Sequence, residues 1–318
     1  MQLQGIKSTK CFKPMAMDKF SRWVTPLKHR SVEPLYAGQN IEYEDFPCTI
    51  DVTGPLLYTL FQERWRDTQI GHVVEGSVLE LEFTQPPKIC LLYDGYLTVV
   101  TEAWHLHLCI EEHLGGPLQK TPPELRQQRL IHRASLYRRL NDRGEARSWG
   151  IQFWNGAGEK MMNLFLPNPF LGADEDLLPE GKPQLDKLSL YEELRQIYVL
   201  GDRPMPFDHN PLKRPYISVC RSSRCYPSRN WPPIYEALQQ AVEEAGVDVT
   251  VMNAGCLEVC KLGPVVFYSG DRTWYTRVTP EIAKQIVNDH LVSGEKVTYH
   301  LYPPMSEIQI GTVSYTNS

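Results

Sequence analysis

The sequence predicts an α+β N-terminal domain with a central antiparallel sheet, followed by a C-terminal α/β domain. Two observations support this division. Short alternating apolar segments joined by turn residues fill residues 71–166, and a strand–helix–strand order begins after residue 213. A stretch rich in proline and acidic residues lies between them. We therefore predict a first domain at 1–166, a connector at 167–212, a second domain at 213–302 and a tail at 303–318.

The composition is that of a soluble globular protein. The 318 residues are enough for two domains, and 42% of them are hydrophobic and 22% charged. A net charge of −5 gives no general attraction to nucleic acid. The N-terminus lacks the apolar run of a signal peptide, and no stretch approaches the roughly 18 apolar residues of a membrane helix. We therefore expect a cytoplasmic protein without membrane insertion, whose thiols stay reduced.

The first domain opens with residues 1–48, which show no clear periodicity. The first predicted helix spans about Thr53–Asp67, because Thr53 is a good N-cap, Pro55 suits a first turn, and an apolar stripe follows. Strands are predicted at 77–83 and 104–110, and a hairpin at 89–101 turns at Asp94-Gly95. In the connector, a short helix is predicted at about Ser189–Val199.

The strand at 104–110 carries the first candidate site. In a strand, His105, His107 and Cys109 point to one face, and His113 follows just beyond. These side chains are ligands suited to a metal ion or to haem iron. The alternative is a polar sheet face on which the histidines form hydrogen bonds to their neighbours.

A basic segment and a second hairpin complete this domain. A helical pattern at 123–132 begins a run of basic side chains. The run indicates either a solvated helix face or a site for propionates or phosphates. It consists of Arg126, Arg129, His132, Arg133, Arg138 and Arg139. The hairpin of strands 148–154 and 160–166 resembles the antiparallel repeats of bacterial haem-utilisation and haem-carrier proteins. That resemblance implies a tetrapyrrole pocket lined by Trp149, Phe153, Trp154 and Met161. The alternative is that these side chains form a packed sheet core.

The second domain has the predicted order β-α-β-β-β-α, which is close to a thioredoxin-like arrangement. The predicted strands lie at 216–220, 247–252, 265–268 and 274–278. A helix spans Pro232–Ala245 and stops at Gly246, and a last helix begins at Pro280, with Thr279 as its cap, and ends at Gly294.

Four of the eight cysteines form two close pairs in this domain. Cys220 closes the first strand and Cys225 lies in the following loop, while Cys256 and Cys260 follow the second strand. If the two strands are parallel neighbours, both loops leave the sheet at the same edge and gather four thiolates. Such a set can hold an iron–sulfur cluster or a structural zinc ion. No Cys-x-x-Cys opens a helix, which argues against a thiol–disulfide oxidoreductase.

The same segments resemble the thioredoxin-like [2Fe-2S] ferredoxins over about Arg214–Tyr302. The resemblance rests on Cys220-Arg-Ser-Ser-Arg-Cys225, on Cys256-Leu-Glu-Val-Cys260 with the following Gly263-Pro264, on Trp274-Tyr275 and on Thr279-Pro280-Glu281. It implies a [2Fe-2S] cluster bound by Cys220, Cys225, Cys256 and Cys260. It also implies low-potential electron transfer to a redox partner protein, and a homodimer in some members of the family.

The leading hypothesis is therefore an electron-transfer protein, in which a ferredoxin module serves a partner or cofactor engaged by the N-terminal domain. We expect an electron carrier rather than a stand-alone enzyme, and no catalytic residue is predicted. One alternative is a haem- or metal-handling oxidoreductase that uses the cluster as its electron source. Another is an interaction module held by structural zinc.

Overall fold

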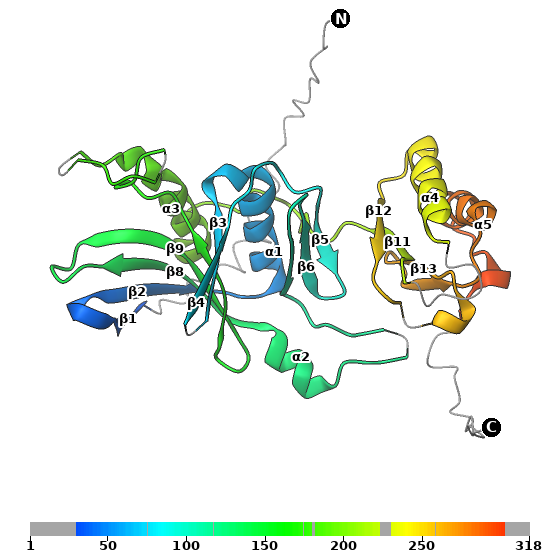
Figure 1. The fold of residues 1–318 in the computed structure, drawn as a ribbon, viewed down its shortest axis with the longest axis horizontal. Coiled ribbons are helices and arrows are strands. Elements are labelled where there is room, and N and C mark those ends of the chain that lie inside the picture. Colours follow the sequence, from blue (N-terminus) through cyan, green and yellow to red (C-terminus); the bar gives the residue numbers. More distant parts are fainter. Residues whose placement is uncertain are drawn as a thin grey trace, which may run out of the picture. The chain divides into compact units, whose positions relative to one another are not determined.

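The computed structural model describes residues 30–74, 76–116, 118–173, 175–179, 182–222, 230–257 and 259–302 (Figure 1). Cys225, residues 1–29 and the predicted tail lie outside these residues. The chain forms two compact units. Unit 1 comprises the described residues up to Cys90, those of Val99–Ile110 and those of Arg129–Pro211. Unit 2 comprises Leu91–Thr98, the described residues of Glu111–Gln128 and the described residues from Leu212 onward.

Unit 1 contains the predicted antiparallel sheet. Seven strands lie in the order β1-β2-β8-β9-β10-β3-β4, and every neighbouring pair is antiparallel. Most of β9 is buried on both faces, which places it in the core of the unit. The strands are β1 (Arg30–Pro34), β2 (Asn40–Phe46), β3 (Gln69–Val74), β4 (Ser77–Leu81), β8 (Ile131–Leu140), β9 (Ala146–Asn155) and β10 (Lys160–Phe165).

Three of these strands differ from the elements that the sequence predicted. β1 and β2 lie where no element was predicted, and β8 takes up basic residues that were interpreted as a helix face. The reason is charge pairing between strands. Glu42 on β2 lies opposite Arg138 on β8 and is only 3% exposed, so a buried face of β2 carries a carboxylate. Apolar alternation is therefore absent from the sequence, although the strand is buried.

A smaller sheet has the strand order β5-β6-β7, with β5 at Ile89–Tyr93, β6 at Tyr96–Val100 and β7 at His105–Cys109. The predicted hairpin turn is confirmed. Asp94 has φ 41° and Gly95 has φ 83°, and a two-residue hairpin turn of type I′ needs positive φ at both positions.

The first helix differs at its start from the prediction. α1 spans Ile50–Tyr58 and continues as a π-helix over Thr59–Glu63 and a 3-10 turn over Trp65–Asp67. Thr49 occupies the N-cap position, and Thr53 is buried inside the helix, where its hydroxyl donates to the Thr49 carbonyl at 3.0 Å. The cap predicted at Thr53 was therefore wrong, because its side chain satisfies a carbonyl within the first turn instead.

The other helices of the N-terminal half are short. α2 spans Pro123–Arg129, within the predicted basic segment. The helix predicted near residue 189 is confirmed as α3 (Ser189–Leu194), which follows a 3-10 turn at Leu185–Leu188 and continues as a π-helix over Arg195–Leu200. Arg195 binds Glu44 of β2 at 2.6 Å, so this helical segment is attached to the main sheet of unit 1.

Unit 2 contains the predicted β-α-β-β-β-α order: β11 (Tyr216–Cys220), α4 (Pro232–Ala245), β12 (Thr250–Ala254), β13 (Val266–Tyr268), β14 (Thr273–Tyr275) and α5 (Pro280–Gln285). The sheet order is β12-β11-β13-β14, with β11 and β12 parallel and the other pairs antiparallel. β12 begins three residues later than predicted. A π-helix over Ile286–Val292 extends α5, and 3-10 turns cover Cys260–Leu262 and Thr298–His300.

The helices α4 and α5 share one core with the sheet of unit 2 (Figure 1). Apolar residues of α4 recur at helical spacing, as in Ile234, Leu238 and Ala241, and pack with Ile217 and Val219 of β11. The predicted cap of α5 is confirmed, because Thr279 Oγ1 accepts from the Ile282 amide at 3.3 Å. No helix in the described part of the chain is long and apolar enough to cross a membrane.

Candidate metal centre

The parallel pairing of β11 and β12 brings the cysteine loops to one edge of the sheet. Cys220, the last residue of β11, lies opposite Ala254, the last residue of β12. The next residue along, Arg221, still donates its amide to the Ala254 carbonyl at 3.0 Å. Cys256 follows β12 by two residues. The arrangement of strands on which the predicted site depends is therefore present.

Cys256 and Cys260 form a close sulfur pair at this edge. Their Sγ atoms are 3.5 Å apart. Two thiolates on one tetrahedral metal, each about 2.3 Å from it, lie about 3.8 Å apart, whereas disulfide sulfurs are about 2.05 Å apart. The observed distance thus fits two ligands of one metal. Burial raises the pKa of the Cys260 thiol, and the neighbouring thiols of Cys256 and Cys220 raise it further.

The three described cysteines of the predicted ligand set differ in their access to solvent. Cys220 is 1% exposed, Cys260 is partly exposed and Cys256 is exposed. Cys225 lies outside the described residues, so the complete set of four is not seen. Within the described ranges, no three His, Cys, Asp or Glu side chains are gathered closely enough to hold a metal ion. The donor chemistry and the Cys256–Cys260 distance fit a metal centre.

The histidine face predicted on β7 is present in part. His105 and His107 are both exposed, and they lie on the same face by strand alternation, whereas Cys109 is 2% exposed. Burial lowers the pKa of His107, and the charge of His105 lowers it further. In unit 2, His113 has other partners: its Nδ1 is 2.8 Å from Thr121 Oγ1 and its Nε2 is 3.4 Å from Asp94 Oδ2.

The aromatic residues of the second hairpin do not line one pocket. Trp149 and Phe153 lie on one face of β9, while Trp154 lies on the other, against Tyr43 at a centroid distance of 5.2 Å. The guanidinium of Arg133 lies 4.2 Å from the centroid of the Trp154 ring. The packed sheet core, which was the alternative interpretation, is what the structure shows for these side chains.

Two side chains of the basic run also form ion pairs within the sheet of unit 1. Arg133 binds Asp45 at 3.0 Å, and Arg138 binds the buried Glu42 at 2.8 Å. These two cations are therefore already paired with carboxylates of β2. The interpretation of the whole run as a solvated helix face was wrong, because Arg133, Arg138 and Arg139 belong to β8.

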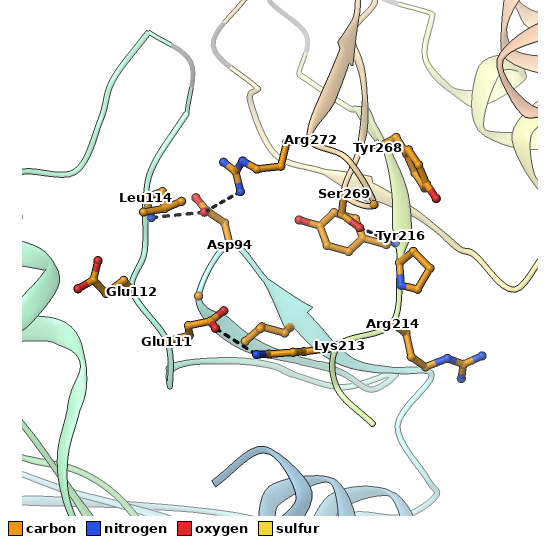
Figure 2. Close-up of a pocket in the computed structure, with 14 residues that line it drawn as sticks. Asp94, Glu111, Glu112, Leu114, Lys213, Arg214, Tyr216, Tyr268, Ser269 and Arg272 are labelled. Carbon is orange, nitrogen blue, oxygen red and sulfur yellow. Dashed lines mark hydrogen bonds and ion pairs between the residues drawn. The ribbon is translucent and has the colours of Figure 1, made fainter. Parts of the chain in front are cut away.

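A pocket of about 480 Å³ in unit 2 was not predicted (Figure 2). Lys213 lies 3.5 Å from Glu111, and Arg272 lies 4.0 Å from Asp94. Acidic and basic side chains are balanced, so the pocket does not favour a ligand of one charge. Its walls come from four separate stretches of sequence, which is why no local pattern indicated it. The charged lining residues are Asp94, Glu111, Glu112, Lys213, Arg214 and Arg272.

Comparisons with known proteins cover both parts of the chain. Residues 30–200 match a family described as "Family of unknown function (DUF7676)". A 2Fe-2S ferredoxin of Clostridium pasteurianum is 33% identical over 92 residues, which are 26% of this chain and 89% of that protein. This relative confirms the ferredoxin resemblance that the cysteine motifs indicated.

Two solved structures are similar to parts of the chain. The thioredoxin-like [2Fe-2S] ferredoxin from Aquifex aeolicus is 24% identical, with a TM-score of 0.26, over 28% of this chain and 97% of that one. ChuS, an E. coli haem oxygenase, is 13% identical, with a TM-score of 0.30, over 49% of this chain and 36% of that one. The chain therefore belongs to the family of unknown function DUF7676 through residues 30–200, and to the 2Fe-2S ferredoxin family over the 92 residues shared with the clostridial protein.

Proposed function

We propose that this protein is an electron carrier that holds a [2Fe-2S] cluster on Cys220, Cys225, Cys256 and Cys260. The observation that carries the proposal is the 3.5 Å separation of Cys256 Sγ and Cys260 Sγ, at the edge where parallel β11 and β12 end. The ferredoxin relative supports the choice of the cluster over zinc. The assignment of residues 213–302 as a ferredoxin domain, after an N-terminal domain at 1–166 and a connector at 167–212, is part of the same proposal.

The cysteines have different roles in this function. A bound cluster supplies one-electron transfer without a change of ligands. Cys220, at 1% exposure, anchors the site inside the unit. Cys256 is exposed and leaves one side of the site open to a redox partner protein. A second copy of the chain is the other partner that the family resemblance implies, and light scattering of the holoprotein tests for it.

Anaerobic purification and reconstitution of the full chain test this function. We expect two irons and two sulfides per chain, a visible charge-transfer spectrum, and an EPR signal that appears on reduction with dithionite. Cys260→Ala, which removes the ligand atom, loses these features, whereas Cys90→Ala, a change at a cysteine outside the site, keeps them. Protein without iron and sulfide after reconstitution contradicts the proposal, and one zinc per chain identifies the structural zinc module instead.

A haem- or metal-binding role of the N-terminal half is a separate proposal. The observation that favours it is the exposure of both His105 and His107 on one face of β7. Haem titration of the wild type and of His107→Ala tests it. A haem absorption band that forms with the wild type and is lost in the variant supports the proposal. The absence of binding in both proteins ends it without affecting the cluster.

A further inference from the structure

One face of the sheet in unit 2 bears the buried cluster ligand. Ile217 and Val219 of β11 point to the core shared with α4 and α5, so the alternate residues Tyr216, Ser218 and Cys220 point to the opposite face. These three are 4%, 0% and 1% exposed. Because α4 and α5 occupy the other side of the sheet, a different part of unit 2 must exclude water from this face.

The hairpin of β5 and β6 supplies that cover. Tyr93, the last residue of β5, stacks on Tyr216 with a centroid distance of 5.0 Å and an interplanar angle of 27°. The neighbouring Leu92 amide donates to the Leu212 carbonyl at 3.0 Å, which holds the hairpin to the chain that leads into β11. Figure 2 shows Tyr216 beside the ion pair of Asp94 and Arg272, which joins the tip of the same hairpin to the β13–β14 turn.

The aromatic contact continues across the sheet. The Tyr216 ring is 5.9 Å from that of Phe267 on β13, and Phe267 is 4.5 Å from Trp274 on β14. Tyr93 therefore ends a row of four rings that spans β11, β13 and β14. Large rings with few rotatable bonds exclude water well at such a contact.

Tyr93 also lies within the electrostatic reach of the cluster ligand. Burial raises the pKa of Tyr93 to about 12, the Ser218 hydroxyl lowers it, and the negative charges of Asp94 and Cys220 raise it again. Tyr93 is therefore an uncharged ring at neutral pH, placed over the strand that ends in Cys220. Because the Tyr93 ring is uncharged, it acts on the Cys220 sulfur by excluding solvent rather than through a charge of its own.

Solvent exclusion has a defined consequence for a cluster. Reduction adds one negative charge to the cluster and its thiolates, and a site with little water stabilises that charge poorly. Solvent exposure is accordingly one of the factors that set the potential of such centres. A residue that keeps water from Cys220 lowers the reduction potential.

We propose that Tyr93 is a positioning residue of the cluster site: by stacking on Tyr216 it closes the Cys220-bearing face of the sheet to water and holds the reduction potential low. This inference rests on the proposed function. It assigns to a hairpin in the DUF7676 stretch, residues 30–200, a direct influence on a centre formed by residues 220–260.

Redox titration of the reconstituted full chain followed by EPR tests the inference. Tyr93→Ala is compared with Tyr93→Phe, which keeps the ring, and with Tyr299→Ala at a tyrosine that is 98% exposed. We expect equal potentials for the wild type, Tyr93→Phe and Tyr299→Ala. For Tyr93→Ala we expect a positive shift corresponding to up to a tenfold change in the ratio of oxidised to reduced cluster, about 59 mV for one electron. In heavy water, we also expect deeper deuterium modulation of the EPR signal in Tyr93→Ala, because solvent then lies closer to the cluster.

The possible results separate the two proposals. An intact cluster whose potential is the same in Tyr93→Ala and the wild type, or is lower in the variant, overturns the inference and leaves the proposed function standing. A wild type without a cluster overturns both. If Tyr93→Ala does not fold, Tyr93→Leu decides, because it keeps apolar bulk without the ring, and its potential must then lie above that of Tyr93→Phe.

Discussion

The Nδ1 atom of His290 lies 2.8 Å from the hydroxyl of Tyr275, inside unit 2. The imidazole is 7% exposed, and its Nε2 is 3.1 Å from Asp271 Oδ2, so both ring nitrogens have partners. The π-helix that extends α5 is thereby tied to β14 and to the β13–β14 turn. This contact and the pairs described above lead to four predictions.

Replacing His290 removes a hydrogen-bond partner from the buried Tyr275 hydroxyl and from the partly exposed Asp271 carboxylate. We expect His290→Ala to lower the free energy of unfolding by about 1–3 kcal/mol, because the Tyr275 hydroxyl and the Asp271 carboxylate lose their shared partner. Urea denaturation measures the change. Tyr299→Ala, at an exposed position, should stay within about 0.5 kcal/mol of the wild type. Equal stability of both variants would show that the His290 contacts contribute nothing.

The carboxylate of this network makes stability depend on pH. Burial alone would raise the pKa of Asp271, but hydrogen bonds from Lys296 and Thr273 and the charge of His290 hold it below its ordinary 3.8. Ionised Asp271 therefore stabilises the folded state above about pH 4, and this contribution disappears as the pH falls through the lower pKa of the folded state. Unfolding free energies between neutral and acidic pH should converge for the wild type and Asp271→Asn. Glu236→Gln, a change at an exposed position of α4, serves as the control and should keep the profile of the wild type.

The buried carboxylate of β2 depends on a cation from β8. Arg138 binds Glu42 at 2.8 Å, and Arg30 of β1 binds the same carboxylate. We expect Arg138→Ala to cost about 1–3 kcal/mol of stability, because Glu42 is 3% exposed and would lose a charged donor. Arg147→Ala removes an exposed partner of Glu145 and should cost less than about 1 kcal/mol. A smaller loss for Arg138→Ala than for Arg147→Ala in urea denaturation would contradict this account.

The tip of the β5–β6 hairpin requires glycine for two separate reasons. Gly95 has φ 83°, and a Cβ there would lie 2.6 Å from the Glu111 carbonyl oxygen. Gly144 has a similar φ of 77° but open space around its Cβ position. Gly144→Ala therefore measures the cost of the backbone angle alone, about 1 kcal/mol. Thermal denaturation should show Gly95→Ala to be clearly less stable than Gly144→Ala, and equal melting temperatures would refute the steric contribution.

Local signals explain what could be predicted from the sequence. β11, the start and end of α4 and the Thr279 cap are marked by residues within or beside each element, and the structure has them where they were expected. Glu42 shows the limit of this approach. Its burial depends on an arginine ninety-six positions further along the chain, so nothing near it indicates a strand. The helix start at Thr49 was missed because Thr53 and Pro55 also fit the general preferences for a cap and first turn.

The site shows the same division. Cys220 and Cys256 could be placed at one edge from strand order alone, because parallel neighbouring strands end on the same side. Tyr93 could not be connected with them. Its stacking partner, Tyr216, belongs to a distant part of the sequence, and an aromatic residue at the end of a hairpin strand is also typical of an ordinary sheet face.

Because β11 pairs with β12, the number of residues between Cys220 and Cys256 does not determine how far apart these two thiols lie. The backbone hydrogen bonds of these two strands set how far Cys220 lies from the loop that begins after Ala254. The helix between the strands returns the chain to the opposite end of the sheet, so its length does not enter that distance. The length of α4 is therefore set by the packing of its apolar residues on the sheet, such as Ile234 and Leu238, and not by the positions of the sulfur atoms.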